Sequence, residues 1–303
     1  MTVLEAISKS ADFLGKKGVE SPRLNAELLL AHLLKLPRMK LYLNFERALT
    51  AGETDGLREL VKRRGMREPL QHITGSTSFC GCEIAVSRSA LVPRPETELL
   101  AELGWQFLTE RRAPARLEAS GLPQRAELEL GAPTAVDFGT GTGCIAIALA
   151  VKCPGAQITA LEVSAEALAL ARQNAELNKV AGRIEFLAGD GFATLAAKTG
   201  LDLIISNPPY IASAEIETLE PEVRDFDPRA ALDGGADGLD FYRRLAAAEA
   251  ACLKPDGKIM VEFGDGQAAA IKKIFEGEKW IVERVQEDYS HRSRILVARL
   301  VDF

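Results

Sequence analysis

The sequence predicts an α/β fold in which a mostly parallel sheet with helices on both faces follows a small N-terminal helical domain. Strand-like and helix-like segments alternate from Thr134 to the end of the chain, whereas residues 1 to about 68 show helical periodicity only. Alternating strands and helices are typical of a doubly wound sheet, because each helix returns the chain to start a parallel neighbour. At 303 residues the chain is also long for one hydrophobic core, which favours two domains.

The composition is that of an ordinary water-soluble globular protein, with 47% hydrophobic and 26% charged residues. No apolar run approaches the ~20 residues that are needed to cross a bilayer. The first segment carries Glu5 and Asp12 among periodic apolar residues, which predicts a helix rather than a signal peptide. We therefore expect a cytoplasmic, monomeric protein without a membrane partner.

The cysteines and histidines do not predict a metal site. The five cysteines lack the paired C-x-x-C spacing of zinc sites, and their number is odd, so we expect reduced packing residues. We expect the three histidines to be surface or capping residues. These residues are Cys80, Cys82, Cys144, Cys153, Cys252, His32, His72 and His291.

The net charge of −6 is spread unevenly along the chain. Residues 1–75 have a balance of +4, which leaves −10 for the remainder. A basic cluster, Lys62, Arg63, Arg64 and Arg67, accounts for the positive excess. We interpret it as a solvated helix end; the alternative is a contact for an acidic partner or RNA.

The N-terminal domain, residues 1–70, is predicted to be a bundle of three or more short helices. Val3, Ile7, Ala11 and Leu14 follow helical spacing, and Ser21-Pro22 is typical of an N-cap followed by a proline at the first helical position. A third helix is predicted over residues 51–64, and an alternating pattern over residues 71–92 predicts a β-hairpin linker.

The larger domain is predicted to span residues 93–303. It opens with a helix, and we interpret residues 109–133, which show weak periodicity, as a surface linker without an assigned role. Only seven residues separate the last two strands, too few for a helical crossover, so these strands should pair antiparallel. The predicted strands are 134–138, 157–162, 184–188, 201–206, 257–263, 280–286 and 294–300, and the main helices are 165–178, 238–253 and 267–276.

A glycine-rich loop follows the first strand of this domain, with Gly139, Gly141 and Gly143 at alternate positions around Thr140 and Thr142. Open α/β sheets bind nucleotides at such loops. The third glycine of the dinucleotide fingerprint would fall at Cys144, so the spacing differs. The loop instead resembles the S-adenosyl-L-methionine (SAM) loop of Rossmann-like methyltransferases.

Two carboxylates extend this interpretation. Glu162 ends the second strand, 19 residues after Gly143, where a carboxylate can accept hydrogen bonds from both hydroxyls of a ribose. Ser164 is a candidate N-cap for the next helix. Asp190, followed by Gly191, lies where methyltransferases of this type place an acceptor for the adenine amino group. The order and spacing favour SAM over a dinucleotide.

The fourth strand runs into Asn207-Pro208-Pro209-Tyr210, hereafter the NPPY corner. Consecutive prolines lack N–H groups and fix φ near −65°, so the chain must leave the sheet there and stay stiff. A planar –NH₂ group needs two acceptors in fixed directions, which the Asn207 side-chain oxygen and the Pro208 carbonyl could supply. The Tyr210 ring could pack on a planar amide or base.

Together with the loop, this corner resembles the amino-methyltransferases that act on adenine, cytosine or glutamine amide nitrogen. The segments P-R-P-E-T-E (93–98), D-F-D-P-R-A-A-L-D-G-G (225–235), V-E-F-G-D-G-Q (261–267) and D-Y-S-H-R-S (288–293) narrow the choice. With these, the chain from about Glu68 onward resembles the release-factor glutamine methyltransferases, the HemK/PrmC family.

The resemblance implies methylation of the side-chain N5 of the Gly-Gly-Gln glutamine in peptide chain release factors, with S-adenosyl-L-homocysteine as the second product. It also implies a helical domain that grips the release factor. Carried onto this sequence, cofactor binding falls to the loop residues 139–143, Glu162, Asp190, Gly191 and Asn207. Catalysis and substrate binding fall to Asn207, Pro208, Pro209 and Tyr210, with Arg94 and Glu96 as further substrate contacts.

Two positions depart from the family pattern. Position 162 is Glu where many relatives have Asp, and Gly191 stands where some members have an aromatic residue. Alternatives are the same chemistry on a ribosomal-protein glutamine or on a nucleic-acid base, for which the acidic catalytic half is unsuited. A SAM-binding module without catalysis would be expected to lose Asn207. A dinucleotide oxidoreductase is disfavoured by the glycine spacing. We expect no metal and no direct nucleic-acid partner.

Overall fold

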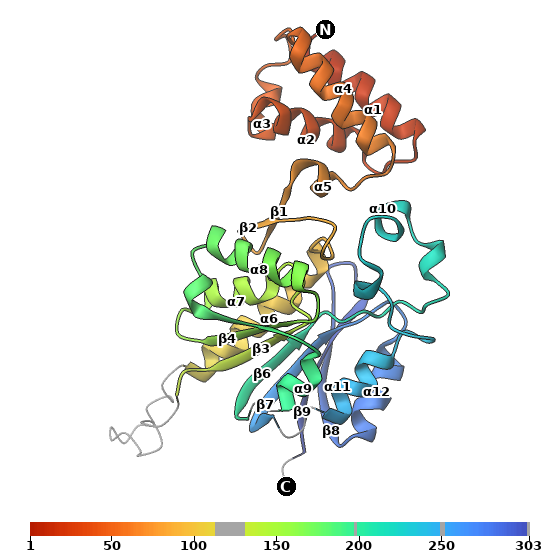
Figure 1. Cartoon of the computed structure of the whole chain (residues 1–303). Helices are drawn as coiled ribbons and strands as arrows, with labels where there is room; N and C mark the ends of the chain where they lie inside the picture. Colours follow the sequence, from red (N-terminus) through yellow and green to blue (C-terminus); the bar gives the residue numbers. More distant parts are fainter. Residues whose placement is uncertain (113–130, 197–198, 249–251, 302–303) are drawn as a thin grey trace. The chain divides into compact units, whose positions relative to one another are not determined.

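The computed structural model describes residues 1–112, 131–196, 199–248 and 252–301 (Figure 1). These residues form two compact units. The first unit comprises Met1–Thr77 together with Leu219–Phe226, and the second comprises Ser78–Thr218 and Asp227–Phe303. The expected division at residues 70 and 92 stays a prediction; the unit boundary falls inside β1 (Ser76–Phe79). Most of the segment 109–133 lies outside the described residues, although its first four residues end α6.

The first unit is a helical bundle around one apolar core. Capping boxes start α1 and α4, where Thr2 and Thr50 exchange hydrogen bonds with Glu5 and Glu53. The expected N-cap at Ser21 and the proline at the first helical position are confirmed, although Ser21 adopts φ 46° and its side chain makes no capping bond to the described backbone. The helices are α1 (Val3–Lys16), α2 (Pro22–Leu34), α3 (Arg38–Tyr42), α4 (Ala51–Gly65), α5 (Leu70–Thr74) and, from the later segment, α10 (Pro221–Arg224).

Side chains of the basic cluster bind the segment Leu219–Phe226 to the helical bundle. Arg64 is 6% exposed; its Nε donates to the Asn25 side-chain oxygen at 2.8 Å, and its Nη2 donates to Glu222 at 2.8 Å. Arg67 also donates to Glu222, at 2.6 Å, and Arg63 pairs with Glu68. Three of the four basic side chains are therefore committed to carboxylates of their own unit, which favours neither of the two interpretations made from sequence.

The second unit is built on a seven-stranded sheet in the order β5-β4-β3-β6-β7-β9-β8. All pairs are parallel from β5 to β7, and β9 pairs antiparallel with both β7 and β8, as predicted. The strands are β3 (Thr134–Phe138), β4 (Gln157–Glu162), β5 (Ile184–Ala188), β6 (Leu201–Ser206), β7 (Leu253–Glu262), β8 (Trp280–Glu287) and β9 (Ser293–Leu300).

Helices cover both faces of this sheet (Figure 1). Side chains alternate along the strands, so Ala135 and Leu203 belong to a core with α6 and α7, whereas Val136 and Ile204 belong to a core with α11 and α12. Of the predicted helix 238–253, residues 240–248 form α11 and residues 238, 239, 252 and 253 are not helical, while residues 249–251 lie outside the described residues. The helices are α6 (Pro95–Arg112), α7 (Cys144–Lys152), α8 (Ala165–Leu177), α9 (Gly191–Ala196), α11 (Asp240–Ala248) and α12 (Ala268–Gly277), with 3-10 turns at Ala181–Arg183, Ile216–Thr218 and Arg229–Ala231.

The predicted hairpin is present as β1 and β2 (Cys82–Ala85), which form a separate two-stranded sheet. All five cysteines are described and carry free thiols, and four of them are buried. Within the described ranges, no helix has the length and apolar character that a bilayer span requires.

The Arg64 contacts generate a test of the first unit. Arg64→Ala should loosen the segment around α10 by roughly 2 kcal/mol, because Asn25 loses its charged partner and Glu222 keeps only Arg67. Trypsin should then cleave after Arg224 about 30-fold faster. The control Arg58→Ala removes a pair with Asp55 that is 68% exposed on both sides and should leave the rate unchanged. Equal rates in both variants would contradict this role of Arg64.

Candidate active site

A cavity of about 460 Å³ opens in the second unit where β3, β4 and β6 end. This is the edge of a parallel sheet at which α/β proteins bind ligands, and the volume is in the range of small-molecule sites. Most of the residues predicted from sequence line it. They are Arg94, Gly139, Thr140, Gly141, Thr142, Glu162, Asp190, Gly191, Asn207, Pro208 and Pro209.

Three predicted residues are not among the described residues that line the cavity. Gly143 starts α7 with φ 82° and packs against Ala171, where a Cβ would lie 3.0 Å from the Ala171 Cβ. Tyr210 packs against the core on the α11 side of the sheet, and burial raises the pKa of its phenol to about 12. Glu96 is exposed at the start of α6. The roles predicted for these three residues stay predictions, as do those of the residues that line the cavity.

Asp137, the penultimate residue of β3, stabilises the glycine loop through hydrogen bonds. Its Oδ2 accepts hydrogen bonds from the Thr140 hydroxyl at 2.5 Å and from the Ala146 backbone N–H at 3.0 Å. Complete burial raises the pKa of this carboxyl to about 7. Gly139 adopts φ 72°, and a Cβ there would meet nothing within 4 Å. The loop thus presents bare backbone to open space, as the close approach of a nucleoside ligand requires.

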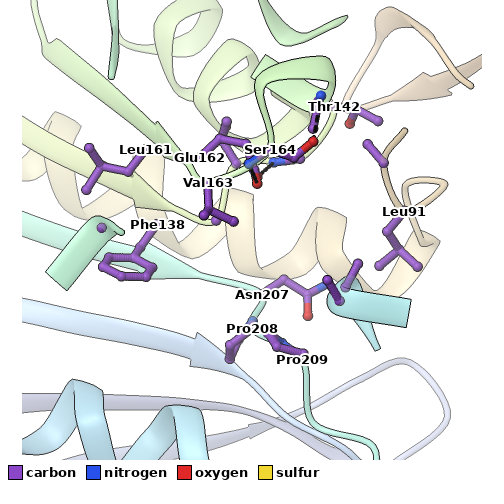
Figure 2. A pocket seen from close by; sticks show the side chains of 18 of the residues that line it. Leu91, Phe138, Thr142, Leu161, Glu162, Val163, Ser164, Asn207, Pro208 and Pro209 are labelled. Atoms are coloured by element: carbon purple, nitrogen blue, oxygen red, sulfur yellow. Dashed lines mark hydrogen bonds between the residues drawn. The ribbon is translucent and has the colours of Figure 1, made fainter. Parts of the chain in front are cut away.

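Glu162 lies at the end of β4 and faces the cavity across from the NPPY corner (Figure 2). Its two carboxylate oxygens accept hydrogen bonds from the Gly141 N–H at 2.9 Å and the Ser164 N–H at 3.0 Å. Each oxygen keeps a further lone-pair site for a ligand hydroxyl. Ser164 caps α8 as predicted, because its hydroxyl accepts from the Ala167 N–H. Glu162 therefore joins the glycine loop to the ribose position that the sequence predicts.

The part of the cavity around Asp190 is lined by apolar and aromatic side chains. Phe138, Phe192 and Phe241 pack on one another with ring centroids 4.8 to 5.4 Å apart. Arg244 lies 3.9 Å from the centroid of the Phe192 ring and donates to Asp190 at 3.2 Å. The sequence analysis missed these four residues, as well as Val163, which is 72% exposed beside Glu162. The apolar and aromatic residues suit the faces of a planar base.

The NPPY corner is fixed by contacts on both sides. Ser206, the last residue of β6, donates its hydroxyl to the Phe138 carbonyl at 2.7 Å. Asn207 donates its side-chain Nδ2 to the Thr97 hydroxyl oxygen at 3.1 Å. Gln267 accepts from the Gly264 N–H at 2.9 Å and donates to the Tyr210 carbonyl at 2.9 Å. Figure 2 shows Asn207, Pro208 and Pro209 together on the wall opposite Val163.

Arg94 is held by an acidic residue that the sequence analysis did not single out. Its guanidinium donates to Asp227 Oδ2 at 2.7 Å, and Asp227 also accepts from the Val92 N–H at 3.4 Å. Burial raises the pKa of Asp227, against the lowering effect of Arg94. This pair ties the segment before α6 to the segment after α10. Among the described residues, no cluster of His, Cys, Asp and Glu is placed to bind a metal ion.

Two further buried polar residues, Thr97 and Glu262, lie behind Asn207. Thr97 is 2% exposed and Glu262 is 3% exposed. Burial raises the pKa of Glu262 to about 7; the Thr97 hydroxyl lowers this pKa and the nearby charge of Glu96 raises it. Both residues belong to segments quoted in the sequence analysis, but no pattern indicated that they would meet.

The raised pKa of Glu262 predicts a pH dependence of stability. Because the folded-state pKa exceeds the ordinary 4.5, this contribution to stability is fully present below pH 4.5 and is lost as the pH rises through about 7. Glu262→Gln cannot ionise. Its unfolding free energy relative to the unsubstituted protein should therefore rise between pH 5 and pH 8, by at most roughly 3 kcal/mol. Asp137 titrates in both proteins and cancels. Urea denaturation at both pH values measures this difference, which should be constant if Glu262 stays ionised throughout.

Comparison with known proteins agrees with the fold. The family description "PrmC N-terminal domain" matches residues 5–75, and "Methyltransferase small domain" matches residues 121–220. The catalytic domain of hMettl16, solved in complex with an RNA hairpin, covers 84% of this chain and 83% of its own, with a TM-score of 0.52 and 14% identity. That similarity concerns the fold alone.

Curated relatives match nearly the whole length. The release factor glutamine methyltransferase of Geobacter sulfurreducens is 43% identical over 274 residues, which cover 90% of this chain and 88% of the relative. The protein of the same name from Chlorobaculum tepidum is 39% identical over 296 residues, which cover 97% and 95%. On this similarity, the chain belongs to the family of release factor glutamine methyltransferases.

Proposed function

We propose that this protein transfers a methyl group from SAM to the side-chain amide N5 of the glutamine in the Gly-Gly-Gln motif of peptide chain release factors. The observation that carries the proposal is that Asn207, Pro208 and Pro209 of the NPPY corner line the same cavity as the glycine loop and Glu162. Family membership supports the reaction, and the names of the relatives support release factors as substrates.

The corner offers the two acceptors that a primary amide requires. Asn207 commits its Nδ2 to Thr97, so its Oδ1 can accept one N–H of the substrate amide. The Pro208 carbonyl would accept the second N–H. With both hydrogens bound, the nitrogen is held in one orientation, and alignment of the reacting atoms is the main catalytic resource of such a displacement. The rigid Pro-Pro segment keeps the two acceptors at a fixed separation.

The cofactor would lie along the glycine loop, with Glu162 at its ribose and Asp190 near its adenine. SAM supplies an activated methyl group, whose C–S bond breaks as the new C–N bond forms, leaving S-adenosyl-L-homocysteine. The chain's contribution is to bind and orient both molecules and to exclude water with apolar walls such as Val163 and Phe138. We assign no general base, because the methylated amide nitrogen can release its extra proton to water.

The remaining assignments follow from the same proposal. The N-terminal helical unit would recognise the body of the release factor, while the second unit performs the transfer. The protein would act as a monomer in the cytoplasm, with the hairpin β1–β2 as the linker.

Glu162→Ala should weaken SAM binding by about 10- to 100-fold, because charged hydrogen bonds to the ribose are lost together with the contacts to the loop. Isothermal titration calorimetry measures this loss. Glu166→Ala is the matched control: this exposed glutamate starts α8 outside the cavity and should leave SAM affinity unchanged. Equal affinities in all three proteins would remove Glu162 from the cofactor site.

Asn207→Ala should reduce methyl transfer to a release factor by at least about 100-fold while SAM still binds, because the oriented acceptor for the substrate is removed. The measurement is mass spectrometry of a purified release factor after incubation with SAM, with the modified peptide sequenced. Methylation on the Gly-Gly-Gln glutamine by the unsubstituted protein supports the proposal. Methylation elsewhere, or equal rates in the variant, would falsify the role assigned to the corner.

A further inference from the structure

Asn174, near the end of α8, is fully buried and uses its whole side-chain amide. Its Oδ1 accepts a hydrogen bond from the Ala85 N–H at 2.8 Å, and its Nδ2 donates to the Ala85 carbonyl at 3.0 Å. The same Nδ2 also donates to the Thr142 carbonyl at 2.9 Å. These three bonds use both hydrogens and the oxygen of a primary amide. An aspartate could not supply the two donors, and a leucine would supply neither donors nor an acceptor.

Through Thr142, Asn174 fixes one peptide group of the glycine loop. The carbonyl of this peptide is bonded to Asn174, and its N–H, which belongs to Gly143, donates to the Thr140 carbonyl at 2.8 Å. In a planar trans peptide the carbonyl and the N–H point in opposite directions, so bonds to both groups set the rotation of the peptide plane. Asn174 is not among the described residues that line the cavity. The Thr142 carbonyl is therefore directed into the protein.

Through Ala85, Asn174 also fixes the approach to a second part of the cavity. Ala85 ends β2, and the chain first lines the cavity four residues later, at Ser89. The lining residues that follow, hereafter the 89–94 wall, are Ser89, Ala90, Leu91, Pro93 and Arg94. Ala90 packs against α8, and a Cβ at Gly141 of the glycine loop would lie 3.9 Å from the Ala90 Cβ. The loop and the 89–94 wall thus approach each other closely, and one side chain is bonded to the backbone of both segments.

We infer that Asn174 is a positioning residue, which couples the glycine loop to the 89–94 wall so that the binding of SAM and the placement of this wall stabilise each other. The inference rests on the proposed function, because it takes the loop as the SAM site and Arg94 as a substrate contact. A coupling free energy is reciprocal, so a bond that lets bound SAM stabilise the wall also lets the wall stabilise bound SAM.

Attachment of β2 to α8 does not by itself require Asn174. Asn178, one turn further along the chain, donates its Nδ2 to the Glu83 carbonyl of β2 at 2.8 Å and to the Asn174 carbonyl at 2.9 Å. The structure records no bond from Asn178 to the glycine loop among the described residues. The contact with Thr142 is therefore what distinguishes Asn174, and Asn178 provides a matched control.

The first test measures SAM affinity by isothermal titration calorimetry. Asn174→Ala should weaken SAM binding about 10-fold, because the Thr142 carbonyl loses its buried partner and the loop peptide is free to rotate. Asn178→Ala should leave the affinity unchanged. At saturating SAM, single-turnover transfer by Asn174→Ala should stay within about 3-fold of the unsubstituted rate, because bound SAM then holds the loop in place. A loss of folded protein alone would lower the active fraction without changing the dissociation constant.

The second test follows hydrogen exchange of the Ala85 N–H by NMR, with and without S-adenosyl-L-homocysteine. Any ligand stabilises the whole fold, and exchange in β8, at the far edge of the sheet, reports that general effect. In the unsubstituted protein the ligand should slow exchange at Ala85 about 10-fold more than in β8. This extra protection should persist in Asn178→Ala and disappear in Asn174→Ala.

The outcomes separate the two proposals. Ala85 protection no greater than that of β8, or SAM affinity in Asn174→Ala equal to that of Asn178→Ala, would overturn the coupling. The proposed function would then still stand if the unsubstituted protein methylates the release factor. If the unsubstituted protein binds no SAM, the proposed function itself fails. If Asn174→Ala does not fold, the exchange comparison in the unsubstituted protein still decides the inference.

Discussion

The active site depends on the point at which β6 must end. Pro208 and Pro209 cannot donate to a neighbouring strand, so hydrogen bonding to the sheet stops at Ser206, at the edge where the glycine loop also begins. The chain that leaves the sheet is then held on its far side. Gln267 binds the Tyr210 carbonyl, and a Cβ at Gly238, where φ is 75°, would lie 2.4 Å from that carbonyl oxygen. Backbone stiffness and tight packing together give the corner a single position.

Two buried carboxyl groups, whose charged forms destabilise the folded state, lie at the same edge of the sheet. Asp137 and Glu262 are buried carboxyls whose pKa values burial raises to about 7, and each has one oxygen without a partner among the described residues. Asp137 holds the glycine loop through Thr140 and the Ala146 N–H, whereas Glu262 ends β7 beside the corner. Asp137 thus stabilises one wall of the cavity at the expense of global stability, as expected where function sets the choice of residue.

The sequence predicts the sheet closely because its strands are short apolar runs bounded by glycine, proline or charged residues. The predicted limits of β3, β4, β5 and β6 coincide with the observed ones. Local motifs also locate the loop, Glu162 and the corner. Contacts between distant segments are not encoded in any local pattern. Asn207 and Thr97 are 110 positions apart, and the basic cluster meets Glu222 more than 150 positions later. Such pairs appear only once the fold brings the segments together.

The central claim is that the NPPY corner binds the amide of a glutamine through two fixed acceptors. The most direct measurement is a crystal structure of the protein with S-adenosyl-L-homocysteine and the Gly-Gly-Gln domain of a release factor. The account predicts that the glutamine side-chain nitrogen lies within about 3 Å of both Asn207 Oδ1 and the Pro208 carbonyl oxygen. A glutamine bound outside the cavity, or one whose nitrogen contacts neither acceptor, would contradict it.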